Sequence, residues 1–157
     1  MNLQIQSSAF DNGERIPDRY TTEGADVSPP ITITGVPEDA EALVVICDDP
    51  DAPQPDPWVH WLIWNIPPNK PSLPDRISTV ESPDEVSEAV QGMNDFGNLG
   101  YGGPAPPPGH GTHHYRFTVY ALRQPLDLSA GAERPELESA MENHVIEQAG
   151  LTGTYER

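Results

Sequence analysis

The sequence predicts a mainly β fold in one domain, an antiparallel or mixed sandwich with a helix near its C-terminus. Three long runs have strand character, at residues 42–47, 58–66 and 113–122. They are joined by segments rich in proline and glycine, of which the 157-residue chain has 19 and 13, and helices do not alternate with the strands. That order argues against a parallel α/β sheet. The length suits one domain, residues 1–157, which can bury about two-thirds of its unfolded surface.

The first third of the chain contains two short strands. Apolar and polar residues alternate over residues 3–7, which predicts an edge strand. Residues 11–30 contain D-N-G and S-P-P and are expected to form loops and turns. Isoleucine then alternates with threonine over residues 31–34, which predicts a second strand.

The middle of the chain holds the longest apolar runs. A-L-V-V-I-C at 42–47 has the length and branching of a central strand that is buried on both faces. W-V-H-W-L-I-W-N-I at 58–66 is again long and apolar. Residues 67–91 are rich in Pro, Ser and acids and predict a surface segment, with one helical turn near Asp84–Ala89.

The C-terminal segment has a helical pattern of apolar residues. The members of the pattern lie at i, i+3, i+4, i+7 and i+8, and they are Leu137, Ala140, Met141, His144 and Val145. Pro135 suits the first turn of such a helix, and Gly150 suits its C-terminal stop. We therefore expect an amphipathic C-terminal helix.

The charge of the chain is strongly negative. Twenty-five acidic residues against eight basic ones give a net charge of −17, which repels nucleic acids and anionic membranes. The acids are spread along the chain, which favours a surface adapted to high salt. Cys47 is the single cysteine, so no intramolecular disulfide can form. With no signal-peptide pattern and no apolar run near the ~20 residues of a membrane span, we expect a cytoplasmic protein.

Two histidines are candidates for a pocket. In a strand over 113–122, His113 and Tyr115 share the more apolar face, and His114 lies on the other. In the strand over 58–66, His60 shares a face with four apolar residues, which are Trp58, Leu62, Trp64 and Ile66. Each histidine is near the start of a strand, beside a stiff loop. The alternative is that each is a core histidine with a satisfied hydrogen bond.

The two loops beside these strands are built from proline, glycine and aspartate. D-D-P-D-A-P at 48–53 places Asp49 and Asp51 next to prolines, either as a turn or as a preorganised carboxylate that could orient a histidine. In Y-G-G-P-A-P-P-P-G-H-G-T-H-H-Y at 101–115, the prolines suit a rigid wall. Gly109 and Gly111, on either side of His110, could expose backbone N–H groups to an anion.

Metal and nucleophile chemistry find little support in the sequence. His113 and His114 are adjacent and point to opposite faces, so only one of them could join His110 at a metal, and no metal site is expected. No G-x-S-x-G motif is present. Asp49 and His60 could still act as an acid–base pair in a hydrolase or phospho-transfer enzyme.

Three spaced motifs together resemble the phosphatidylethanolamine-binding protein family, in its bacterial and archaeal Raf-kinase-inhibitor-like branch. They are D-P-D-A-P at 49–53, W-V-H-W at 58–61 and G-Y-G-G-P-x-P-P-x-G-x-G-x-H-H-Y at 100–115, and the resemblance spans nearly the whole chain. It implies a β-sandwich of a large antiparallel-rich sheet and a smaller sheet with peripheral helices. It also implies a cavity for phosphate, acetate or a phospholipid headgroup, formed by Asp49, Pro53, Trp58, His60, Pro107, Gly109, His113 and Tyr115. His114 stands where an arginine is common in the family.

These features lead to the hypothesis of a non-enzymatic binding protein for a small anion. We expect His60 and His113 to donate hydrogen bonds to the anion, Gly109 to allow close backbone approach, and Pro53 and Pro107 to form walls. Binding should strengthen below about pH 7, where histidine becomes cationic. By the resemblance the chain could modulate a kinase or protease, and a homodimer is possible, with no cofactor. The alternatives are the Asp49/His60 enzyme and an interaction scaffold with a vestigial pocket.

Overall fold

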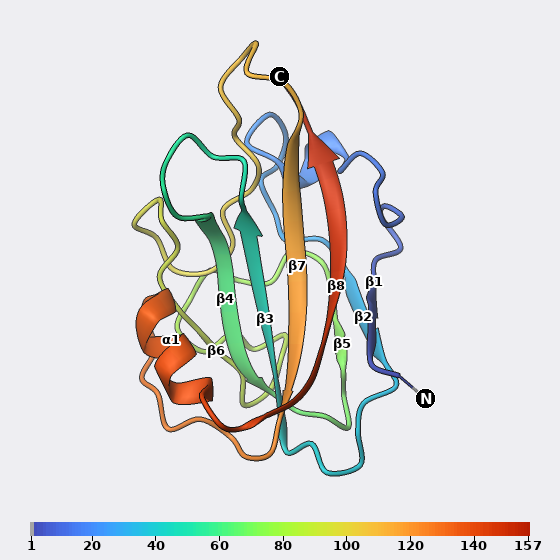
Figure 1. The fold of residues 1–157 in the computed structure, drawn as a ribbon, viewed down its shortest axis with the longest axis vertical. Helices are drawn as coiled ribbons and strands as arrows, with labels where there is room; N and C mark the ends of the chain where they lie inside the picture. The colour runs from blue at the N-terminus through green and yellow to red at the C-terminus, as the bar shows by residue number, and fades with distance from the viewer. Residues whose placement is uncertain (1) are drawn as a thin grey trace.

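The computed structural model describes residues 2–157 and has two antiparallel sheets packed face to face (Figure 1). The smaller sheet has the order β1-β2-β5, and the larger has the order β6-β4-β3-β7-β8. The strands are β1 (Gln4–Gln6), β2 (Ile31–Thr34), β3 (Ala42–Asp49), β4 (Trp58–Ile66), β5 (Ser72–Leu73), β6 (Val90–Gln91), β7 (His113–Leu122) and β8 (Val145–Tyr155). The helices are the 3₁₀ helix η1 (Asp18–Tyr20) and the α-helix α1 (Arg134–Met141). The predicted sandwich of a larger and a smaller sheet is confirmed.

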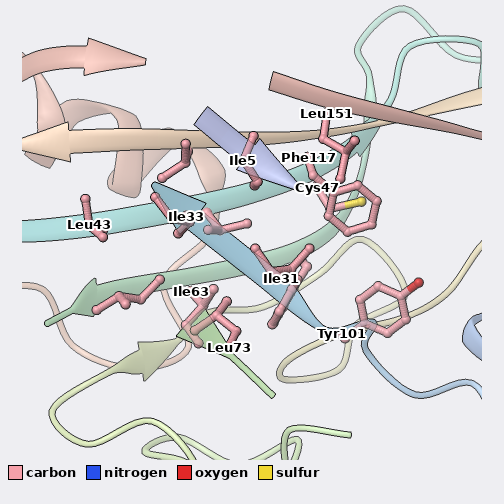
Figure 2. Close-up of a cluster of buried hydrophobic side chains, with 14 of the residues drawn as sticks. Ile5, Ile31, Ile33, Leu43, Cys47, Ile63, Leu73, Tyr101, Phe117 and Leu151 are labelled. Atoms are coloured by element: carbon pink, nitrogen blue, oxygen red, sulfur yellow. The ribbon is translucent and has the colours of Figure 1, made fainter. Parts of the chain in front are cut away.

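Two apolar clusters bury both faces of the large sheet. Between the sheets, the small sheet contributes Ile5, Ile31 and Ile33, and the large sheet contributes Leu43, Cys47, Phe117 and Leu151 (Figure 2). On the opposite face, Leu137 and Met141 of α1 join a second cluster with Leu62 and Trp64 of β4. All eight residues of β3 are therefore buried, as predicted for a central strand.

Strand β7 keeps the alternation that its sequence predicts. His113, Tyr115 and Phe117 are buried toward the small sheet, while His114 and Arg116 are exposed on the opposite face. Neither helix in the described part of the chain has the length and apolar character needed to cross a membrane.

The C-terminal segment differs from the prediction of a helix that stops at Gly150. The helix ends at Met141, and Asn143 then takes a left-handed conformation with φ of 70°. Residues 145–155 form β8, which pairs with β7 along its length. Leu137 and Met141 do follow the helical pattern and are buried, but Val145 is exposed. Pairing with β7 and burial of alternate residues near the end of β8 outweigh the helical period there.

The surface segment at 67–91 also differs in detail from the prediction. The expected helical turn near Asp84–Ala89 is absent from the described residues. In its place are two successive turns, in which the Val86 N–H donates to the Pro83 carbonyl and the Ala89 N–H donates to the Val86 carbonyl. The start of the segment contributes the two-residue strand β5 to the small sheet, and its end contributes the two-residue strand β6 to the large sheet.

Candidate functional site

A small cavity lies at the end of the large sheet where β3 ends and β4 and β7 begin. These strand ends are at the top of Figure 1. Because these strands are antiparallel, Asp49 at the end of β3 comes beside Trp58 at the start of β4. The cavity has a volume of about 180 Å³. It is lined by Asp49, Ala52, Pro53, Trp58, His60, Phe96, Ala105, Pro106, Pro107, His113 and Tyr115.

A β-bulge in β4 lets His60 line this cavity. Cys47 pairs with Trp61 and Asp48 pairs with Val59, so His60 is the extra residue of the bulge. Trp58 and His60 thus line the cavity while the adjacent Trp61 enters the core between the sheets.

The prediction of one shared face for five residues of β4 is wrong for the same reason. Leu62 and Trp64 pack in the second cluster, away from the cavity. Another register shift, between the pairs of Leu43 and Val45, returns Ile66 to the core between the sheets. Strict alternation fails because each bulge adds a residue on one strand only.

His113 is held in the cavity by Asp49. Its Nδ1 lies 2.6 Å from Asp49 Oδ2, and both side chains are at least 95% buried. The carboxylate accepts this bond, so the proton resides on Nδ1, and Asp49 Oδ1 also accepts from the Asp51 N–H at 2.8 Å. His113 Nε2 lies 2.6 Å from Nδ1 of the exposed His110. The orienting contact expected between Asp49 and a histidine is therefore present.

His60 is held by the loop before β7. Its Nδ1 lies 2.7 Å from the Gly102 carbonyl, and its ring is nearly fully buried. Burial is the largest influence on this side chain and lowers the pKa of His60, while the Gly102 carbonyl opposes that change. A neutral His60 with its proton on Nδ1 is therefore the favoured form at neutral pH.

Gly102 and Gly103 are required for this approach of the loop. A Cβ at Gly102 would lie 2.7 Å from the Phe96 ring, and one at Gly103 would lie 2.4 Å from the Tyr20 carbonyl oxygen. The Gly103 N–H donates to Asp26 Oδ1 at 2.7 Å, which anchors the loop beside the carbonyl that binds His60.

Two buried polar groups on the lining residues have no hydrogen-bond partner among residues 2–157. They are the hydroxyl of Tyr115 and the indole N–H of Trp58. Burial raises the pKa of Tyr115 well above its ordinary value, so the hydroxyl keeps its proton and can donate. Such unpaired buried groups are rare, and each one calls for an explanation.

The rest of the wall is apolar and aromatic. Phe96 packs edge-on against both His60 and Trp58, with ring centroids 5.4 Å apart in each case, and Phe96 is 40% exposed. Arg157 holds the proline segment, since its Nε donates to the Pro106 carbonyl at 2.6 Å.

The structure brings seven of the eight predicted site residues together: Asp49, Pro53, Trp58, His60, Pro107, His113 and Tyr115. Gly109 does not line the cavity. Its N–H donates to the Arg157 carbonyl. The position favours glycine because its φ is 77°, and not because another group approaches its backbone closely, since a Cβ there would meet nothing within 4 Å. His114 turns away and binds Asp51 on the exposed face.

Phe96 is the main residue that the sequence reasoning missed. It lies in N-D-F-G at 94–97, a segment whose apolar residue is isolated between polar residues and glycine. The sequence showed only an aromatic residue in a turn, and this does not indicate which part of the structure that side chain contacts. Within residues 2–157, no group of three or more His, Cys, Asp or Glu side chains is arranged to hold a metal ion.

Comparison with known proteins identifies the family of this fold and cavity. The family model for phosphatidylethanolamine-binding protein matches residues 6–156. A UPF0098 protein of Pyrococcus horikoshii is 50% identical over all of this chain and 78% of its own length. The crystal structure of Escherichia coli YbcL, described as a member of the mammalian PEBP family, has a TM-score of 0.92 and 32% identity, covering 100% of this chain and 99% of that one.

A second solved structure has the same fold over its full length. It is a PEBP homologue from Chlamydia trachomatis, with a TM-score of 0.89 and 37% identity, covering 99% of this chain and 98% of that one. The match of the family model extends over nearly all of the described strands and over every residue that lines the cavity. The chain therefore belongs to the phosphatidylethanolamine-binding protein family.

Proposed function

We propose that this chain is a binding protein for a small anionic group of the phosphate type, held in the cavity between β3, β4 and β7. The observation that carries the proposal is the Tyr115 hydroxyl, which is buried, unpartnered and part of a residue that lines the cavity. An unmade hydrogen bond of a buried group costs about 1–3 kcal/mol, and a ligand oxygen would recover it.

The lining residues take distinct roles in this proposal. Tyr115 donates to a charged ligand oxygen, and His113, oriented by Asp49, forms the polar floor. Pro53, Pro107 and the aromatic rings exclude water from the bound group. This changes the donor roles expected for both histidines from the sequence. A neutral His60 ring uses its one N–H for the Gly102 carbonyl. His113 uses Nδ1 for Asp49, and its Nε2 already lies 2.6 Å from His110 Nδ1.

The size of the cavity limits the ligand to a small group. A volume of about 180 Å³ is below the ~300–1,000 Å³ typical of sites for drug-sized molecules. It suits a phosphate or an isolated headgroup and excludes the acyl chains of a lipid.

The hydrolase alternative gains no support from the geometry. Asp49 pairs with His113 and the Asp51 N–H, not with His60, so the expected Asp49/His60 acid–base pair is not formed. Serine, threonine and cysteine are absent from the residues that line the cavity in the described chain. The roles as a modulator of other proteins and as an interaction scaffold stay predictions.

Calorimetric titration with inorganic phosphate and phosphoethanolamine tests the proposal. Wild-type protein should bind at least one of them, and Tyr115→Phe should weaken binding roughly tenfold or more, because it removes one hydrogen bond to a charged group. Tyr120→Phe is the matched control, since Tyr120 is on the same strand but packs against the second cluster. Equal affinity in wild type and Tyr115→Phe would contradict the proposed role of this cavity.

A further inference from the structure

His60 offers the cavity a hydrogen-bond acceptor and not a donor. A backbone carbonyl can only accept, so the 2.7 Å contact with Gly102 places the ring proton on Nδ1. The Gly102 N–H in turn donates to the His60 carbonyl at 2.9 Å, so ring and loop are joined from both sides. Nε2 of the neutral ring then carries a lone pair, and the side-chain hydrogen bond that His60 makes within residues 2–157 is at the other ring nitrogen, Nδ1.

The surroundings of His60 do not supply a permanent positive charge. Asp48 and Asp49 lie at the end of β3, His113 and Tyr115 come from β7, and Asp95 lies beside Phe96 with its carboxylate on the Val59 N–H. The acidic neighbours favour a protonated ring, but burial is the larger influence and acts against it.

The nearest arginines are bound elsewhere. Arg116 and Arg134 both bind Asp48, which faces away from the cavity, at 2.8 and 2.7 Å. Arg157 binds the Pro106 carbonyl and Glu23. Lysine and arginine are absent from the lining of the cavity in the described chain. A fully ionised anion would therefore place an oxygen, which can only accept, against the lone pair of His60 Nε2. Two acceptors cannot form a hydrogen bond, so the buried oxygen would stay without a partner, which is unfavourable.

Taking the anion-binding function above as its basis, we propose that the cavity selects anions that carry an acidic hydroxyl group. The ligand class is the monoanion of a phosphate monoester, whose P–O–H donates to His60 Nε2 while a charged oxygen accepts from Tyr115. Sulfate esters and phosphodiesters lack that hydroxyl and are rejected. An intact phospholipid is a phosphodiester, so the favoured source of the ligand is a free phosphate monoester.

Three probes of similar shape isolate the hydroxyl. Methyl phosphate loses its second proton near pH 6, so part of it is a monoanion with an O–H at pH 6.5. Methyl sulfate is a monoanion of the same shape without an O–H. Dimethyl phosphate is the corresponding diester monoanion and represents the lipid linkage.

Calorimetric titration of the wild-type protein with the three probes at pH 6.5 and 8 tests whether the cavity selects anions that carry a hydroxyl. We expect methyl phosphate to bind about tenfold or more tighter than methyl sulfate and dimethyl phosphate at pH 6.5. Raising the pH to 8 should weaken the binding of methyl phosphate roughly twentyfold, because the fraction present as the monoanion falls by about that factor. Equal affinities of the three probes at pH 6.5 would overturn the selectivity and leave the anion site standing. No binding of any probe, phosphate or phosphoethanolamine would overturn both proposals.

The tautomer of His60 gives a second, independent readout. Long-range ¹H–¹⁵N spectra of the free protein should show His60 protonated at Nδ1, and a ring protonated at Nε2 would refute the selection mechanism. His60→Gln should narrow the preference for methyl phosphate over methyl sulfate, because an amide can turn either its oxygen or its NH₂ to the ligand. His144→Gln, at the opposite end of the large sheet, is the control and should keep the preference.

Discussion

Replacement of Asp49 by asparagine tests how firmly the site is built into the fold. Asp49 Oδ2 accepts from His113 Nδ1 at 2.6 Å and Oδ1 accepts from the Asp51 N–H at 2.8 Å. Asparagine has one acceptor oxygen, so its NH₂ group must face one of these two donors. Asp49→Asn therefore either leaves the Asp51 N–H unpaired or forces His113 to give up its Nδ1 proton, and in both cases His113 loses its charged acceptor.

The cost follows from burial. The side chains of His113 and Asp49 are 2% and 5% exposed, so solvent can replace neither lost partner. A hydrogen bond to a charged group is worth about 1.5–3 kcal/mol, and removing the buried charge offsets part of that loss. We expect a loss of about 2 kcal/mol in the free energy of unfolding, which lowers Tm by roughly 4–8 °C for a chain of this size.

Urea denaturation and thermal scans at pH 8 measure this loss, with Asp51→Asn as the matched control. Asp51 binds His114 at 2.8 Å, but those side chains are 40% and 54% exposed, and exposed ion pairs contribute about 0–1 kcal/mol. Asp49→Asn should thus be clearly more destabilising than Asp51→Asn. A loss for Asp49→Asn no larger than that for Asp51→Asn would refute the reasoning.

Three further outcomes follow from the structure. The folded state lowers the pKa of His60, so the stability that comes from keeping this ring neutral is complete above the unfolded pKa of about 6.5 and is lost as pH falls toward the lower folded value. The urea midpoint of the wild-type protein should therefore drop between pH 7.5 and pH 5.5. The drop should be smaller in His60→Gln. Gly103→Ala should unfold at clearly lower urea concentration, since its Cβ would lie 2.4 Å from the Tyr20 carbonyl oxygen; an unchanged midpoint would show that the loop can move. With a net charge of −17, Tm should rise from 0.1 to 1 M NaCl as the Debye length falls from about 10 to 3 Å, and a flat Tm would contradict adaptation of the acidic surface to salt.

Local patterns were sufficient for the strands that form the centre of the fold. The continuous apolar run of β3 and the alternation of β7 follow directly from which side chains are removed from water, and both are confirmed. The same patterns were insufficient at the C-terminus. The helical spacing of Leu137 and Met141 continues to Val145 by chance, and only the pairing of β8 with β7 shows that the helix ends at Met141.

The site divides in the same way. The residue types and stiff loops around Asp49, His60 and His113 were evident in the sequence, and so was the face on which His113 lies. The bulge at His60 was not, because a bulge depends on the register of the partner strand, which the sequence of β4 alone does not contain.

The sequence by itself determined the fold class, the central strands and the set of side chains that could hold an anion, because burial and side-chain chemistry are properties of short segments. Only the tertiary structure decided which groups meet. It paired Asp49 with His113 and His60 with the Gly102 carbonyl, buried the Tyr115 hydroxyl without a partner, and packed Phe96 against His60 in the cavity wall. The two hydrogen bonds join residues 42 and 64 positions apart, and their geometry depends on the packing of β3, β4 and β7 together.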